Sequence, residues 1–109
     1  MQEDIAKIWE SEQAQQLAEA LLVIEGAQTM QNFLRDVMTE KEITEISARL
    51  EAARMLTNGE TYTDITKQTK LSSRTVARIS DWLQNGCGGY QAVLKTGKAH
   101  WHSWPVRAD

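Results

Sequence analysis

The stretch "DITKQTKLSSRTVARIS", residues 64–80, decides the fold that we expect for this chain. It spans most of two predicted helices, about 63–69 and 73–84, and the short turn between them at residues 70–72. A helix-turn-helix needs a few apolar positions that lock its two helices at a steep angle. These positions are filled here, and the predicted helix-turn-helix core consists of Ile65, Leu71, Val76 and Ile79.

Positive charge gathers on the same stretch although the whole chain is acidic. Four basic residues and no acid lie between Ile65 and Ser80, whereas the formal net charge of the 109 residues is -3. Residues 1–60 hold 5 Lys and Arg against 12 Asp and Glu, a net charge of -7, and residues 61–109 hold 7 against 3, a net charge of +4. A local positive field attracts polyanions even on an acidic protein. The stretch therefore favours DNA binding over an ordinary helical hairpin whose charges merely face water.

The outer side of this unit carries small, polar and basic residues, which suit a surface that meets phosphates and base edges. Ser72 is expected to cap the second helix and leave free N–H groups for a phosphate. Arg74 is the best candidate to read a guanine through O6 and N7, and Arg78, one turn later, reads a base or holds the backbone. The predicted DNA-binding set is Thr63, Lys67, Lys70, Ser72, Ser73, Arg74, Ala77 and Arg78.

The turn departs from the commonest helix-turn-helix pattern at two positions. Thr66 stands where the helices approach most closely and a small residue is usual, and Lys70 stands where a turn glycine is usual. We expect the helix-turn-helix to tolerate both departures.

The N-terminal half of the chain is also expected to be helical, because strand-like alternation is missing and the single proline is Pro105. One helix is predicted at about 3–25, with Gly26 as its stop, and a second at 27–37. Thr39 and Glu42 fit a capping box, which predicts that a long helix begins there.

The long helix should end at Asn58 and Gly59. Its predicted inner face is Ile43, Ile46, Leu50, Ala53 and Leu56. A last short helix around residues 90–94 follows the flexible "GCGGY" turn. We therefore expect an all-α fold: one multi-helix DNA-binding domain over residues 1–95, with its helix-turn-helix at about 62–84, and a C-terminal tail over residues 96–109.

Composition argues against several other classes of protein. No signal peptide or run of about 18 apolar residues is present, and the single Cys87 cannot form an internal disulfide, so we expect a cytoplasmic protein without a membrane segment. There is no nucleophile-and-base set and no phosphate-cradling motif, so we expect no enzyme and no catalytic residue. In the tail, His100 and His102 give two metal ligands where a site needs three or four, so we expect no metal and no cofactor.

Several motifs follow one another between Asn32 and Leu94. They are "MTEKE" at the start of the long helix, "RLEAARML" and "NGETY" around its end, the Ser-Ser-Arg-Thr-Val start of the second helix of the helix-turn-helix, and "GGYQAVL". In this order they resemble the tryptophan repressor superfamily, and look most like its YerC/YecD-type branch. The resemblance covers over half of the chain.

This resemblance implies a Trp-repressor-like intertwined homodimer that regulates transcription, as a repressor, by binding double-stranded DNA. Two recognition helices about 34 Å apart would read a palindromic operator whose half-sites are one DNA turn apart. A homodimer agrees with the small size of the chain, which leaves apolar helix surface to be covered. The alternative is a helical protein-protein interaction module that acts through its acidic N-terminal helices without DNA binding.

The resemblance also implies an effector pocket at Thr39, Arg49 and Arg78. In tryptophan-binding members two arginines, matched here by Arg49 and Arg78, sandwich the indole, and a glycine after the second leaves room for it. Ile79 stands at that glycine position, and its branched side chain would project where the ring must lie. Tryptophan is therefore not expected as corepressor. Another small effector or none remains open, and Arg49 has a plainer interpretation as the ion-pair partner of Glu45.

Overall fold

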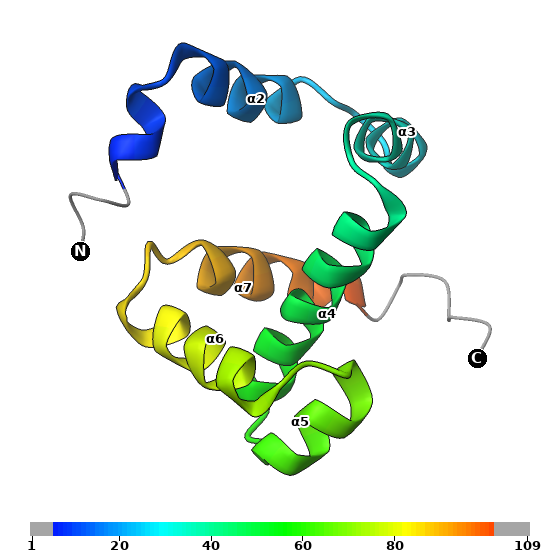
Figure 1. The fold of residues 1–109 in the computed structure, drawn as a ribbon. Helices are drawn as coiled ribbons and strands as arrows, with labels where there is room; N and C mark the ends of the chain where they lie inside the picture. Colours follow the sequence, from blue (N-terminus) through cyan, green and yellow to red (C-terminus); the bar gives the residue numbers. More distant parts are fainter. Residues whose placement is uncertain (1–5, 102–109) are drawn as a thin grey trace. The chain divides into compact units, whose positions relative to one another are not determined.

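The computed structural model describes residues 6–101, and the side chains of residues 6–95. Within residues 6–101 it contains one short 3-10 helix, six α-helices and no strand, which confirms the predicted all-α class. In chain order (Figure 1) the elements are η1 (Ile8–Glu10), α2 (Glu12–Leu22), α3 (Ala27–Val37), α4 (Glu40–Thr57), α5 (Tyr62–Thr69), α6 (Ser73–Asn85) and α7 (Gly89–Trp101). None of the helices in this part of the chain combines the length and the apolar character that crossing a bilayer requires.

The chain divides into two compact units, Met1–Ser47 and Ala48–Asp109. In the first unit the prediction of one helix at about 3–25 is wrong, because Ser11 interrupts it. Ser11 has an extended backbone and its hydroxyl accepts a hydrogen bond from the N–H of Ala14 (3.2 Å), so it ends η1 and caps α2. A serine offers this local bond more readily than it continues a helix. The helix α2 then stops at Leu22, and Gly26 begins α3 at a φ of 87°.

The start of α4 follows the predicted capping box. The N–H of Glu42 donates to Oγ1 of Thr39 (3.1 Å), and the N–H of Thr39 donates to Oε1 of Glu42 (2.8 Å). Two N–H groups that the first turn of a helix leaves without partners are thereby satisfied.

The end of α4 is a Schellman motif centred on Gly59, which has a φ of 82°. The N–H of Glu60 donates to the carbonyl of Met55 (3.0 Å), and that of Gly59 donates to the carbonyl of Leu56 (3.0 Å). A glycine fits this left-handed position without the steric cost that a Cβ would bring. The chain therefore leaves α4 abruptly and enters α5 only a few residues later.

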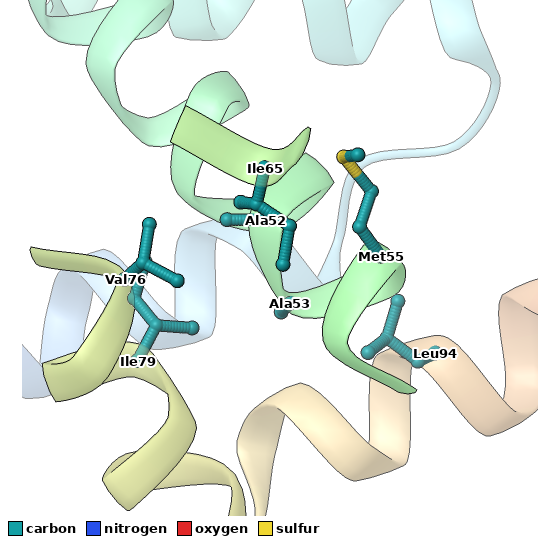
Figure 2. Packing of buried hydrophobic residues seen from close by; sticks show 7 residues of the cluster. All are labelled: Ala52, Ala53, Met55, Ile65, Val76, Ile79 and Leu94. Carbon is teal, nitrogen blue, oxygen red and sulfur yellow. The ribbon is translucent and has the colours of Figure 1, made fainter. Parts of the chain in front are cut away.

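In the second unit, α5, α6 and α7 surround the C-terminal end of α4 (Figure 1). Figure 2 shows the buried side chains gathered there from all four helices. Of the inner face predicted for α4, Ala53 is buried, Leu50 and Leu56 pack against the cluster, and Ile46 is 52% exposed. The buried cluster is Ala52, Ala53, Met55, Ile65, Val76, Ile79 and Leu94.

The last helix is longer than the sequence indicated. It continues past Lys95 to Trp101, into the segment assigned to a tail. Residues 96–101 contain no proline, and Pro105 is the first strong helix breaker after the turn at residues 86–89. Leu94 anchors the helix on the cluster with 8% of its surface exposed.

Candidate nucleic-acid interface

Each helix of the helix-turn-helix begins at a hydroxyl cap. Thr61 accepts a hydrogen bond from the N–H of Asp64 (3.2 Å) at the start of α5, and Ser72 accepts one from the N–H of Thr75 (3.1 Å) at the start of α6. Lys70 lies between them as the C-cap of α5, in the left-handed conformation with a φ of 66° and a ψ of 10°. This backbone geometry turns the chain from α5 into α6.

The inner side of the unit is apolar and closed. Ile65 of α5 and Val76 and Ile79 of α6 have no exposed surface, and Leu71 in the turn packs against them. Thr66, which was expected at the close approach of the helices, is half-buried, and its hydroxyl donates to the carbonyl of Thr63 (3.0 Å). This bond satisfies the hydroxyl within its own helix, so a residue larger than alanine fits at the packed surface.

The outer side of α6 is exposed along its whole length. Arg74, Ala77 and Arg78 are spaced by three and four residues, so they share the face opposite Val76 and Ile79. Neither arginine forms an ion pair or hydrogen bond with a side chain that the structure describes.

The first turn of α6 also offers free backbone donors. Ser72 caps the N–H of Thr75, whereas the N–H groups of Ser73 and Arg74 have no acceptor among the described residues. Free N–H groups and the positive end of the helix dipole favour an anion at this place. The other predicted contacts, Thr63, Lys67 and Lys70, are likewise exposed on α5 and the turn.

Charges on α6 run opposite to the order that would stabilise the helix. The helix dipole favours acids in the first turn and bases in the last turn. Here Arg74 lies in the first turn, no acid is present there, and the exposed acid of the helix, Asp81, lies in its C-terminal half. Asp81 continues the face of Arg74 and Arg78 one turn further and accepts a hydrogen bond from Nδ2 of Asn85 (2.9 Å). It was not among the residues predicted from the sequence, although extending the three-and-four spacing by one turn would have found it.

The three residues predicted for an effector pocket are all exposed. The hydroxyl of Thr39 is engaged in the capping box of α4. Arg49 forms no ion pair with a described side chain, so the expected pair with Glu45 is not made. Arg49 lies close enough to Tyr90 for its charge to act on the phenol: burial raises the pKa of Tyr90, and the positive charge of Arg49 lowers it by a smaller amount.

An open hollow of about 530 Å³ lies at the connection between α3 and α4, and Thr39 lines it with Arg35 and Glu40. Arg35 donates to the carbonyl of Met38 (3.0 Å) and pairs with Glu40 (3.4 Å), so its charge is already engaged. Among residues 6–95 no group of three metal-ligating side chains occurs. The histidines considered for a metal, His100 and His102, lie outside the side chains that the structure describes.

Comparison with known proteins agrees with this geometry. Residues 12–98 match the family model of the Trp repressor protein. The uncharacterized protein YerC of Bacillus subtilis (strain 168) is 34% identical over 79 residues, which are 72% of this chain and 76% of that protein. The crystal structure of a TrpR-like protein from Eubacterium eligens ATCC 27750 superposes with a TM-score of 0.78 at 32% identity, covering 83% of this chain and 93% of the other. A crystal structure from Staphylococcus aureus gives a TM-score of 0.78 at 28% identity, covering 85% and 93%. The chain belongs to the Trp repressor family and, within it, to the branch that includes YerC.

Proposed function

We propose that this protein is a sequence-specific DNA-binding regulator of transcription that acts as a homodimeric repressor on a palindromic operator. The observation that carries the proposal is the outer face of α6, where Arg74, Ala77 and Arg78 are exposed while the opposite face is closed by Val76 and Ile79. An exposed helix with free arginines can enter the major groove of B-DNA, where an arginine fork bonds O6 and N7 of guanine.

Two features that cost stability support a role in binding. Arg74 lies at the positive end of the α6 dipole, where a positive charge destabilises the helix. Lys70 adopts a left-handed backbone conformation, which is strained for a residue with a Cβ. Residues that conflict with local stability gather at functional sites. Both residues would add positive charge where the backbone phosphates of DNA are expected.

The exposed apolar surface of the first unit supports the proposal that the partner is a second copy of the chain. None of the side chains described between residues 6 and 47 is buried, whereas apolar residues there are broadly exposed in the single chain. Exposed apolar surface of this kind marks an interaction site. The largest exposed apolar side chains of this unit are Ile8, Trp9, Leu17, Leu21, Leu22, Val23, Val37 and Ile46.

Sedimentation equilibrium tests the homodimer. Leu17 and Leu21 lie one turn apart on α2 and would both be buried in the dimer interface. Leu21→Asp should shift the protein towards monomer, because dimerisation would then bury an unpaired charge. Gln16→Asp changes an exposed polar residue of the same helix and should leave the association unchanged. A wild-type monomer at all concentrations would contradict the homodimer.

Tryptophan is not proposed as an effector. The side chain of Ile79 is fully buried against the end of α4, so the position where the resemblance requires a glycine is filled by part of the core. Making room for an indole ring would require this packing to open, and close-packed interiors resist such changes.

Selection of randomised duplex DNA on the purified protein tests the whole proposal, with and without tryptophan and at two salt concentrations. We expect a palindrome whose binding weakens steeply with salt, by a slope of about -0.9 per phosphate neutralised, and no effect of tryptophan. A palindrome that appears only with tryptophan would contradict the argument from Ile79. No enrichment would favour the helical interaction module, whose association through apolar surface should respond little to salt.

A further inference from the structure

The exposed face of α6 carries one acid among its bases. Arg74, Ala77, Arg78 and Asp81 follow each other at intervals of three and four residues and are all exposed. Asn85 continues the same face by one more turn. An acid on a surface that approaches phosphates loses binding energy by repulsion, so its presence on this face calls for a compensating contact.

The geometry of Asp81 leaves it available for such a contact. Arg78 is only three residues away, yet the structure contains no ion pair between them. Asp81 instead accepts a hydrogen bond on Oδ1 from Nδ2 of Asn85 (2.9 Å). This bond fixes the carboxylate at the helix surface and leaves Oδ2 as a free acceptor, while Arg78 keeps all of its donors.

We infer that Asp81 determines specificity by accepting a hydrogen bond from N4 of a cytosine, and this inference rests on the proposed function. The major-groove edges of the four bases offer two donors, N4 of cytosine and N6 of adenine. In adenine the acceptor N7 lies beside the donor N6, so a carboxylate that binds N6 has an oxygen close to N7, and the two acceptors repel each other. Cytosine offers the donor without a neighbouring acceptor, so it is the base that a carboxylate prefers.

The spacing along α6 also places this base. Asp81 follows Arg74 by seven residues, which is about 10.5 Å along a helix that rises 1.5 Å per residue. Successive base pairs of B-DNA are about 3.4 Å apart. The cytosine should therefore lie about three base pairs from the guanine read by Arg74 if the helix axis follows the groove.

The test compares the wild type with Asp81→Asn and with Asp64→Asn. Asp64 is an exposed acid on α5 with no side-chain hydrogen bond among the described residues, so its replacement removes the same charge from a different face. Each protein is used for selection of randomised duplex DNA, and its dissociation constant is then measured for the selected operator with each base in turn at the position in question. Circular dichroism checks that the helices are retained.

For the wild type we expect a cytosine preference of about tenfold at that position. Asp81→Asn should move the preference to adenine, because an amide can bond N6 and N7 of adenine together. Asp64→Asn should keep the cytosine preference and change the affinity for all sequences alike.

Two results would overturn the inference. If the wild type selects a palindrome and Asp81→Asn keeps the same base at every position, Asp81 contributes charge alone and the inference fails while the proposed function stands. If the wild type selects no duplex DNA, the proposed function is contradicted, and the inference that Asp81 recognises cytosine is contradicted with it.

Discussion

Gly86 lies directly against the backbone of Trp82. Its N–H donates to the carbonyl oxygen of Trp82 (2.9 Å), and a Cβ built on Gly86 would lie 2.5 Å from that same oxygen. Cβ atoms essentially never come this close to a carbonyl oxygen, so any larger residue would force the backbone to shift where α6 ends and the chain turns towards α7.

Gly86→Ala should therefore destabilise the protein by about 1–3 kcal/mol, because the end of α6 must shift to admit the methyl group. Urea unfolding at a fixed protein concentration measures the change. Gly89→Ala provides the control, since a Cβ at Gly89 meets nothing within 4 Å. Equal stabilities of the two variants would contradict the close approach.

The capping box of α4 gives a second prediction. Thr39→Ala removes the acceptor of the Glu42 N–H and should cost about 1 kcal/mol of folding free energy. Thr44→Ala is the matched change inside the same helix, where the hydroxyl makes no hydrogen bond among the described residues, and alanine there should be neutral or slightly stabilising. A loss for Thr44→Ala as large as that for Thr39→Ala would argue against the cap.

Lys70 should show opposite effects on stability and on DNA binding. Lys70→Gly removes a side chain from a left-handed position and should stabilise folding by about 1 kcal/mol, while it weakens binding to all DNA sequences. Lys67→Ala should weaken binding in the same way with little change in stability, because Lys67 is exposed within α5. A Lys70→Gly protein that binds DNA as tightly as the wild type would remove Lys70 from the interface.

Arg74 should contribute to sequence preference as well as to affinity. Arg74→Ala should relax the preference for one base pair of the operator at a cost of about 1–3 kcal/mol, whereas a phosphate contact such as Lys67 should lose affinity equally on all sequences. Dissociation constants on the selected operator and on single-base variants distinguish the two. Uniform loss for Arg74→Ala would make it a phosphate contact.

The partly buried phenol of Tyr90 should make the folded protein less stable at alkaline pH. Burial raises the pKa of its phenol above the ordinary value of about 10, so the folded state favours the neutral form. The stabilisation that follows is complete below about pH 10 and is lost as the pH rises through the folded-state pKa. Phenylalanine cannot ionise. Between about pH 9 and about pH 11, the free energy of unfolding measured with urea should therefore fall less for Tyr90→Phe than for the wild type. Parallel loss in the two proteins would contradict this assignment.

The sequence predicted the helices wherever a local signal was complete. The capping box at Thr39 and Glu42 and the stop at Asn58 and Gly59 need only neighbouring residues, and α4 begins and ends there. Ser11 shows the opposite case. The apolar spacing of residues 3–25 suits one helix, but a single hydroxyl cap breaks it, since a local hydrogen bond competes with continued helix formation.

The buried face of α4 was harder to predict because it depends on what packs against the helix. Spacing alone selected Ile46, which is 52% exposed, and overlooked Ala52 and Met55, which are buried. The surface of α4 that α5, α6 and α7 cover extends around its C-terminal end. The periodic pattern within α4 cannot show where those three helices pack. Asp81 escaped prediction for a different reason: the basic stretch that defined the predicted interface ends at Ser80, one residue before it.

The distribution of burial also sets the order in which the chain opens. Every buried side chain described lies between Ala52 and Leu94, in the part of the chain that holds α5 and α6. Amide hydrogens that are protected by such a core exchange with solvent only in large openings, whereas those of exposed helices exchange through local fraying. In a single chain, deuterium should therefore enter η1 and α2 long before it enters α6. As long as no second copy covers the first unit, the surface proposed for DNA would thus keep its shape while the N-terminal helices unravel.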